Sequence, residues 1–201
     1  MTTLIIIAGP QSSGKTTAFE FLRKKYPSFR FIPETNMYSV ADRNHRGAAY
    51  VTKELEIQIV KKDIEKIKQI PRSARIVVME TGIFHLIYLE AIADKKTANT
   101  YYRKYTDAMR GFRPVILFID TKPAVSWKRR KPIYEKRTAG IPSVQERKKA
   151  MKKYRSTIER LYPLWIKWYK KFPFEKYMIR NSYKNEEVFL NEVMTISRSR
   201  L

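Results

Sequence analysis

The sequence predicts a single α/β domain of three layers, in which helices cover both faces of a five-stranded parallel sheet. Five short runs of apolar and β-branched residues alternate along the 201 residues with longer segments whose apolar positions recur every three or four residues. Strands that alternate with helices in this way build a parallel sheet. No internal repeat or linker-like stretch divides the chain, so we expect residues 1–201 to form one domain.

A glycine-rich motif follows the first predicted strand. Residues 4–8 are apolar, residues 16–25 have a helical pattern, and residues 9–16 read GPQSSGKT. This is the phosphate-binding pattern GxxxxGK[ST], in the strand–loop–helix context that it requires. Gly9 and Gly14 allow successive backbone N–H groups to point at a phosphate, at the positive end of a helix. The motif predicts a site for a nucleoside triphosphate.

Each residue of this motif has an expected role. Lys15 reaches the β- and γ-phosphates, and the Thr16 hydroxyl binds the Mg²⁺ that bridges them. The expected nucleotide contacts are Gly9, Gln11, Ser12, Ser13, Gly14, Lys15, Thr16 and Thr17. The alternative is a glycine turn that binds nothing, and the complete motif directly after a strand argues against it. ATP is the expected nucleotide: the absence of an Asn-Lys-x-Asp stretch favours adenine, but the sequence does not decide between ATP and GTP.

Composition limits the other classes of function. The chain has no cysteine and only two histidines, His45 and His85, which excludes a thiolate metal site and makes a transition-metal site a poor expectation. No apolar run approaches the roughly 20 residues of a membrane span. The first strand begins directly at the N-terminus, so we expect a cytoplasmic protein with no membrane partner. A homodimer is left open.

The charge of the chain is unusual. Lysine and arginine total 42 against 19 acidic residues, a net charge of +23 that attracts anionic substrates and polyanions. One interpretation is a lysine-rich surface, part of which serves ATP, and the other is nucleic-acid binding. No helix-turn-helix, zinc-finger or RNA-binding signature supports the second interpretation. Nucleic acid is therefore kept as an alternative partner.

The second predicted strand leads to a candidate acceptor site. Residues 29–32 form this strand, and Glu34 lies just beyond its carboxyl end, where ligands bind in open parallel sheets. Residues 34–50 form the expected acceptor region, in which Arg43 and Arg46 are candidates to hold an acceptor phosphate. The alternative for Glu34 is a loop carboxylate in water or a nearby helix cap, and the alternative for the two arginines is a solvated position.

The third predicted strand ends in a second carboxylate. Residues 52–70 have a helical pattern with lysine and glutamate on the face opposite the isoleucines. Residues 74–79 form the strand, and Glu80 at its tip is a candidate Mg²⁺ ligand, because an acidic residue at this position orders the metal in phosphate-loop proteins. The alternative is a surface ion pair.

Two further helices are expected to be structural. Residues 82–93 are mostly apolar and predict a buried helix, whose His85 is expected to be a core or pocket histidine rather than a metal ligand. Residues 94–110 carry Tyr101, Tyr102 and Tyr105 among lysines and arginines. We expect these tyrosines to pack against neighbouring elements, and an aromatic wall for a base is the alternative.

A basic stretch follows the fourth predicted strand, residues 114–120. A helix begins at Pro123, and residues 128–142 are expected to form a lid that brings cations to the transferred phosphoryl group and excludes water. The candidate lid arginines are Arg129, Arg130 and Arg137. A solvated charge run is the alternative.

The C-terminal part contains a long helix, a strand and a closing helix. Residues 143–171 have a helical pattern, and a break in this helix would fall at Pro163. Trp165 and Trp168 are expected to pack against the sheet, with stacking on nucleic-acid bases as the alternative. Residues 177–179 form the fifth strand, and residues 185–196 form the closing helix.

The chain as a whole resembles the nucleoside and nucleotide kinases of the phosphate-loop superfamily, especially the thymidylate kinases and deoxynucleoside kinases. The resemblance implies a three-layer phosphate-loop NTPase fold with a five-stranded parallel sheet and a basic lid. It also implies that Glu34 accepts the proton of an attacking hydroxyl and that Asn181 lies in a loop against adenine. One position departs from the pattern, because Thr81 follows Glu80 where these kinases commonly have an arginine.

The expected activity follows from these features. The chain is predicted to be an ATP- and Mg²⁺-dependent kinase that transfers the γ-phosphoryl group to a nucleoside, a nucleotide or a similar small acceptor. The alternatives are a kinase of nucleic-acid 5′ ends and a nucleotide-dependent ATPase that binds nucleic acid. The sequence does not identify the acceptor.

Overall fold

The five predicted strands form one parallel sheet in the computed structural model, which describes residues 1–35, 48–71, 73–181 and 185–198. The strands are β1 (Thr2–Ala8), β2 (Arg30–Ile32), β3 (Ile76–Glu80), β4 (Phe112–Asp120) and β5 (Glu175–Arg180). They lie in the order β2-β3-β1-β4-β5, and every neighbouring pair is parallel. The predicted five-stranded parallel sheet is confirmed.

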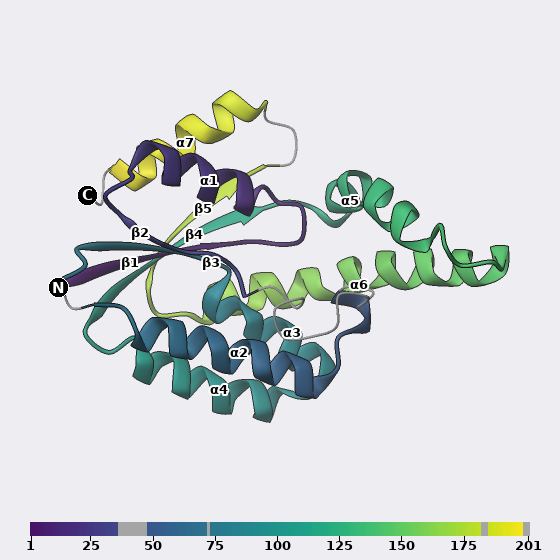
Figure 1. Cartoon of the computed structure of the whole chain (residues 1–201), viewed down its shortest axis with the longest axis horizontal. Coiled ribbons are helices and arrows are strands. Elements are labelled where there is room, and N and C mark those ends of the chain that lie inside the picture. Colours follow the sequence, from purple (N-terminus) through teal and green to yellow (C-terminus); the bar gives the residue numbers. More distant parts are fainter. Residues whose placement is uncertain (36–47, 72, 182–184, 199–201) are drawn as a thin grey trace.

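Helices cover both faces of the sheet, so the molecule has the three expected layers. Figure 1 shows α1 and α7 on one face, and α2, α3 and α4 on the other with the inner part of α6. The helices are α1 (Lys15–Lys25), α2 (Lys53–Lys68), α3 (Leu86–Ile92), α4 (Lys95–Ala108), α5 (Pro123–Thr138), α6 (Val144–Lys171) and α7 (Glu186–Arg198), with short 3-10 helices η2 (Ala48–Tyr50) and η3 (Gly82–His85). None of the helices described here is long and apolar enough to cross a lipid bilayer.

The two hydrophobic cores divide the residues of the central strand between them. Leu4 and Ile6 of β1 belong to the larger core under α2, α3, α4 and α6, whereas Ile5 and Ile7 belong to the core under α1 and α7. This division follows from the two-residue repeat of a strand whose faces are both covered. Trp165 and Trp168 of α6 lie in the larger core with Tyr101 and Tyr105 of α4, and Tyr102 packs against it. The expectation that these side chains pack against neighbouring elements is confirmed.

Helix α5 and the outer part of α6 form an arm that extends past the end of the sheet (Figure 1). Helix α6 runs without interruption from Val144 to Lys171, so the break considered at Pro163 does not occur. Packing of the neighbouring Leu161 and Trp165 in the larger core keeps the helix continuous past the missing N–H group. Tyr134 of α5 stacks on Tyr154 of α6 at 4.0 Å between ring centroids, which joins the two helices.

The carboxyl ends of the strands bring the predicted polar residues to one edge of the sheet. The glycine-rich loop follows β1, Glu34 follows β2, and Glu80 ends β3, which pairs with both β1 and β2. Strand order reverses at β1, because the chain passes from β3 across β1 to β4. Ligands in open α/β sheets bind in the crevice at such a switch point.

Replacing Thr52 with alanine is expected to lower the free energy of unfolding by about 1 kcal/mol. The Thr52 hydroxyl accepts a hydrogen bond from the backbone N–H of Leu55 (3.3 Å) and so caps α2. Urea unfolding with an unchanged slope would measure this loss. The matched control is Thr100→Ala, on an exposed interior position of α4, where no N-cap is lost. Equal effects of the two substitutions would show that the cap contributes nothing.

Candidate active site

The glycine-rich loop has the geometry of a phosphate cradle. Gly9 has φ 152°, and a Cβ there would lie 2.3 Å from the Ile119 carbonyl oxygen. Gly14 has φ 100° and directly precedes α1, so the N-terminus of this 11-residue helix opens into the loop. Ser12 also has a positive φ, 56°. Residues with positive φ among residues with negative φ turn successive backbone N–H groups inwards and form a concave anion site.

Lys15 lies half-buried at the centre of this cradle. Its ammonium group donates hydrogen bonds to the carbonyl oxygens of Gly9 (2.9 Å) and Pro10 (3.2 Å). Burial lowers the pKa of the Lys15 ammonium, and the nearby carboxylates of Glu34 and Glu80 partly offset this effect. The loop's own carbonyl groups thus hold the Lys15 ammonium in the cradle. A bound triphosphate would replace these carbonyl groups as its hydrogen-bond acceptor.

Thr16 and Glu80 form a pair at the mouth of the loop. The Thr16 hydroxyl donates to Glu80 Oε1 at 2.6 Å, which joins the start of α1 to the end of β3. Burial raises the pKa of the Glu80 carboxyl, and the hydrogen bond from Thr16 works against this rise. Both side chains offer hard oxygen donors, which is the donor set that Mg²⁺ prefers when phosphate oxygens and waters complete its shell. The two residues therefore fit the predicted magnesium site.

Glu34 is fixed by the turn that follows β3. Thr81 Oγ1 donates a hydrogen bond to Glu34 Oε1 (2.9 Å), and His85 Nε2 lies 3.7 Å from the same oxygen. Thr81 has φ 63° and ψ −64°, a region that β-branched residues rarely occupy. Strain of this kind persists where the surroundings over-determine a conformation, and it concentrates at functional sites. Thr81, which stands where the kinases that this sequence resembles commonly have an arginine, is thus the residue that orients Glu34, the candidate base.

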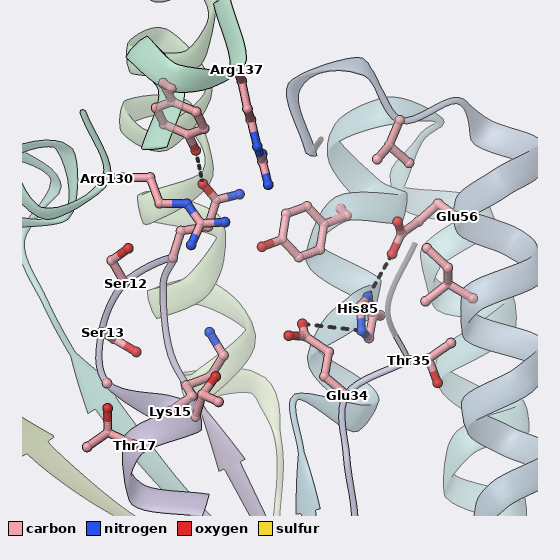
Figure 2. A pocket seen from close by; sticks show the side chains of 17 residues that line it. Ser12, Ser13, Lys15, Thr17, Glu34, Thr35, Glu56, His85, Arg130 and Arg137 are labelled. Atoms are coloured by element: carbon pink, nitrogen blue, oxygen red, sulfur yellow. Dashed lines mark hydrogen bonds and ion pairs between the residues drawn. The ribbon is translucent and has the colours of Figure 1, made fainter. Parts of the chain in front are cut away.

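One cavity connects the phosphate loop to Glu34. It has a volume of about 270 Å³, and Figure 2 shows the loop and Arg130 across the cavity from His85 and Glu56. The lining residues come from the loop and α1 (residues 11–17), from Glu34, Thr35 and Val51, from α2 (Glu56 and Ile59), from His85 and Tyr88, and from α5 (Arg130, Tyr134 and Arg137). Cations stand on the loop and α5 side, and carboxylates stand on the β2 and α2 side.

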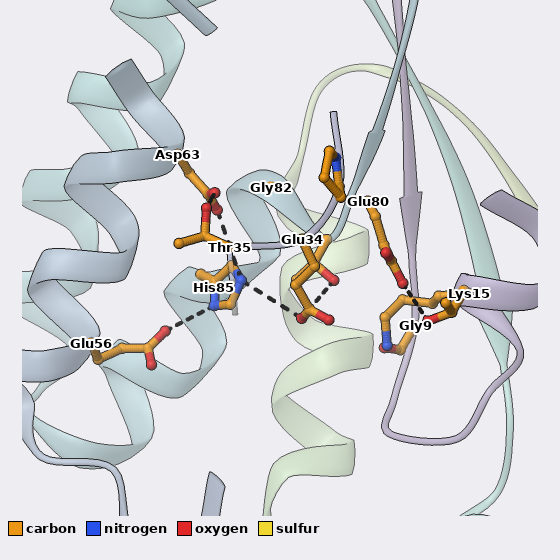
Figure 3. A network of polar contacts seen from close by, with 12 residues as sticks. Gly9, Lys15, Glu34, Thr35, Glu56, Asp63, Glu80, Gly82 and His85 are labelled. Atoms are coloured by element: carbon orange, nitrogen blue, oxygen red, sulfur yellow. Dashed lines mark hydrogen bonds and ion pairs between the residues drawn. The ribbon is translucent and has the colours of Figure 1, made fainter. Parts of the chain in front are cut away.

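The sequence interpretation missed the buried polar cluster on the α2 side of this cavity. Glu56, Asp63 and His85 are 2%, 0% and 5% exposed. Glu56 Oε1 lies 3.0 Å from His85 Nδ1, while Asp63 accepts hydrogen bonds from the hydroxyls of Thr35 and Tyr105. Their common orientation towards His85 is visible in Figure 3. The expectation that His85 is a core or pocket histidine is met, since it is buried and lines the cavity.

The candidate lid helix α5 contacts the phosphate loop directly. The Tyr134 hydroxyl donates to Gln11 Oε1 (2.7 Å), and the Ser126 hydroxyl donates to the Gln11 carbonyl oxygen (2.6 Å).

Two tyrosines that line the main cavity, Tyr134 and Tyr88, were not among the residues expected from the sequence. Their signal was too general, because the chain has 13 tyrosines and neither lies in a recognisable motif.

The three candidate arginines of α5 divide between two hollows. Arg130 and Arg137 line the main cavity, whereas Arg129 donates to the Ser12 carbonyl oxygen (3.2 Å) and faces a second hollow beside the loop. Asn181 lies in this second hollow, where its amide donates to the Ser13 carbonyl oxygen (2.7 Å). The other residues that line it are Ser12, Gly14, Thr17, Glu186 and Phe189.

Two predicted acceptor residues, Arg43 and Arg46, lie outside the described residues. Of the expected acceptor region, residues 34–50, the structure describes Glu34, Thr35 and residues 48–50.

Within the described ranges, no group of three or more His, Cys, Asp or Glu side chains could hold a metal ion by itself. A metal here would thus depend on phosphate oxygens as well as on Thr16 and Glu80.

Comparison with solved structures establishes the fold. Deoxyadenosine kinase from M. mycoides with bound dCTP superposes with a TM-score of 0.65 at 14% identity, over 98% of this chain and 100% of that one. The same kinase with bound dATP gives 0.62 at 15% identity, with the same coverage. The YorR protein from Bacillus subtilis, in complex with phosphorylated GDP, gives 0.57 at 14% identity over 98% of each chain. The expected three-layer phosphate-loop fold is confirmed.

No model of a protein family matches this sequence, and no curated protein is similar to it in sequence.

Proposed function

We propose that this protein is an ATP- and Mg²⁺-dependent kinase that transfers the γ-phosphoryl group to a nucleoside, a nucleotide or a similar small acceptor. The proposal rests on one observation above all: a phosphate cradle and a carboxylate face each other across a single cavity, with Lys15 on one side and Glu34 on the other. The fold supports it, because the similar structures include a deoxyadenosine kinase with bound dCTP and dATP.

On the donor side, the chain's own groups bind and orient the triphosphate. The amides of residues 9–15 and the Lys15 ammonium hold the β- and γ-phosphates, and the N-terminus of α1 adds positive potential. Thr16 and Glu80 would hold Mg²⁺, which when bound supplies charge stabilisation on the β- and γ-phosphate oxygens. Arg130 and Arg137 reach into the same cavity, where cations stabilise the charge spread over the transferred group.

On the acceptor side, the role of Glu34 depends on the attacking group. A hydroxyl must lose its proton as it attacks, and Glu34 is the carboxylate placed to take it. An acceptor phosphate is already anionic, and it would be held by arginines instead. The adenine ring of ATP is assigned to the second hollow, which Asn181 and Phe189 line beside the loop.

A screen for stimulated ADP release tests this function. Purified protein is incubated with MgATP and with separate nucleosides, nucleoside monophosphates and short oligonucleotides, and ADP release is compared with the release without acceptor. At least one small acceptor should raise the rate, and phosphorylated product should appear in equal amount. A failure of every acceptor, together with no binding of a non-hydrolysable ATP analogue, would refute the kinase proposal.

A kinase of nucleic-acid 5′ ends is the second candidate, and the positive charge of α5 and α6 favours it. Residues 123–171 of α5, α6 and their connection contain 16 lysines and arginines against three acidic residues. Such a surface binds phosphate backbones with a strong dependence on salt. Transfer of label from γ-labelled ATP to an oligonucleotide end, lost as salt rises, would support this candidate. Oligonucleotide binding without transfer would instead indicate an ATPase that binds nucleic acid.

A further inference from the structure

His85 has surroundings that the proposed phosphoryl transfer does not yet explain. It is the last residue of η3 and is 5% exposed, yet it lines the cavity beside Glu34. Three carboxylates face its ring: Glu34 from the segment after β2, and Glu56 and Asp63 from α2. Tyr88 of α3 packs nearby, with 5.9 Å between the two ring centroids.

The two ring nitrogens of His85 have different environments. Nδ1 lies 3.0 Å from Glu56 Oε1, which is hydrogen-bonding distance. Nε2 lies 3.7 Å from Glu34 Oε1 and 3.8 Å from Asp63 Oδ2, and no described residue accepts a hydrogen bond from it. Buried N–H groups rarely remain without an acceptor, because desolvation is then uncompensated. Figure 3 shows this nitrogen directed at the space between Glu34 and Asp63.

The carboxylates make the charged form of His85 the favoured one. Burial alone would lower the pKa of His85, but the hydrogen bond to Glu56 and the negative charges of Asp63, Glu56 and Glu34 outweigh it and raise this pKa to about 9. Both ring nitrogens then carry protons. Lys66 offsets part of the carboxylate charge, since its ammonium lies 3.9 Å from Asp63 Oδ1 and donates to Thr35.

We propose that His85 is an acceptor-binding residue: Glu56 and Asp63 hold it as an imidazolium, and its Nε2–H donates a hydrogen bond to the oxygen of the acceptor hydroxyl that faces Glu34. The inference rests on the proposed kinase function. A hydroxyl satisfies both groups at once, because its oxygen accepts from Nε2 while its proton points at the carboxylate. Of the described residues, His85 is also the only cation within 4 Å of the Glu34 carboxylate.

Phosphoryl transfer to such an acceptor breaks two bonds and forms two. The acceptor O–H bond breaks, its proton passes to Glu34, and its oxygen forms a bond to the γ-phosphorus of ATP. The bond from the γ-phosphorus to the β–γ bridging oxygen breaks, and its electron pair leaves with ADP. His85 keeps both protons throughout and fixes the position of the attacking oxygen.

Nitrogen-15 NMR of the imidazole rings tests the charge state without relying on activity. The chain has two histidines, so a His45→Gln variant assigns both sets of signals. His85 should remain doubly protonated at neutral pH and titrate at about 9. Glu56→Gln keeps an acceptor for Nδ1–H but removes the charge, so it should move the titration to lower pH. Glu65→Gln, an exposed position on the same helix, should leave it unchanged.

Two NMR results would overturn the inference. One is a wild-type His85 that titrates near the ordinary value of about 6.5. The other is a titration that Glu56→Gln leaves in place while the variant retains the wild-type circular dichroism. Addition of deoxyadenosine, used as the probe, should shift the Nε2 signal, and an unchanged Nε2 signal at saturating deoxyadenosine would refute contact with such an acceptor.

Kinetics separate this inference from the kinase proposal. His85→Gln should raise the KM for the acceptor roughly tenfold to a hundredfold, the range for a lost hydrogen bond to a charged group, with the KM for ATP unchanged. Wild-type kcat/KM should fall as pH rises through about 9, and Glu56→Gln should move this fall to lower pH. Lys15 also titrates in alkali, but its charged neighbours are Glu34, Glu80 and Arg130 rather than Glu56. The role of His85 would be wrong if kcat/KM of the Glu56→Gln variant fell at the same pH as in the wild type and His85→Gln left the acceptor KM unchanged. Because both variants would still turn over, the kinase proposal would remain.

Discussion

Replacing Lys15 with alanine is expected to lower kcat by roughly a hundredfold or more, the scale of losing one electrostatic stabiliser of a transition state. The ammonium of Lys15 rests on the carbonyl oxygens of Gly9 and Pro10, so it is already placed where β- and γ-phosphates would lie. Negative charge on the β–γ bridging oxygen grows as the phosphoryl group departs, and the amides of the loop remain to bind the ground state. We therefore expect the KM for ATP to rise less than kcat falls. Steady-state ADP release with the best acceptor from the screen measures both quantities.

The matched control for this substitution is Lys24→Ala. Lys24 lies on the same helix, is exposed, and carries the same charge, so its removal changes the net charge equally without touching the cradle. Thermal unfolding of both variants shows whether the fold is intact. The assigned role of Lys15 would be wrong if its alanine variant, folded like the wild type, turned over at the wild-type rate.

The five-stranded parallel sheet and the positions of the strand-end residues illustrate what sequence can predict. The strands β1 and β3 and most of β4 are runs of apolar residues buried on both faces, so their pattern is visible without knowledge of their neighbours. Because all five strands are parallel, Glu34 and Glu80 were expected at one edge, and the structure places them there with the phosphate loop. The contact of Thr16 with Glu80 follows from the same topology.

The cluster of Glu56, Asp63 and His85 could not be predicted, for a physical reason. Two carboxylates two turns apart on α2 look like part of the solvated face that lysines and glutamates form on the rest of the helix. What buries them is a partner 29 residues away in sequence, and no local periodicity records that distance. Helix α6 presents a related limit, since Pro163 is a helix breaker by local rules while tertiary packing of Leu161 and Trp165 overrides it.

Replacing Glu34 with glutamine is expected to lower kcat between a hundredfold and ten-thousandfold if the acceptor is a hydroxyl, the range for removal of a general base (roughly 10²–10⁴). Glutamine has nearly the same shape, and its carbonyl oxygen can still accept the hydrogen bond that Thr81 donates to Glu34 (2.9 Å). The substitution therefore removes basicity and charge while the side chain stays in place. Rapid mixing of enzyme with ATP and acceptor, followed by quenching, measures the chemical step itself.

The same variant also identifies the kind of acceptor. A phosphate acceptor carries its own negative charge and needs no base, so Glu34→Gln should then leave kcat within a fewfold of the wild type and weaken only orientation. Glu54→Gln, exposed in the first turn of α2, is the matched control and should be neutral in either case. A nucleoside substrate that the Glu34→Gln enzyme phosphorylates at the wild-type rate would contradict the assignment of Glu34 as base. The three carboxylates around His85 would then have to be explained by binding of the acceptor alone, because none of them would be needed to remove its proton.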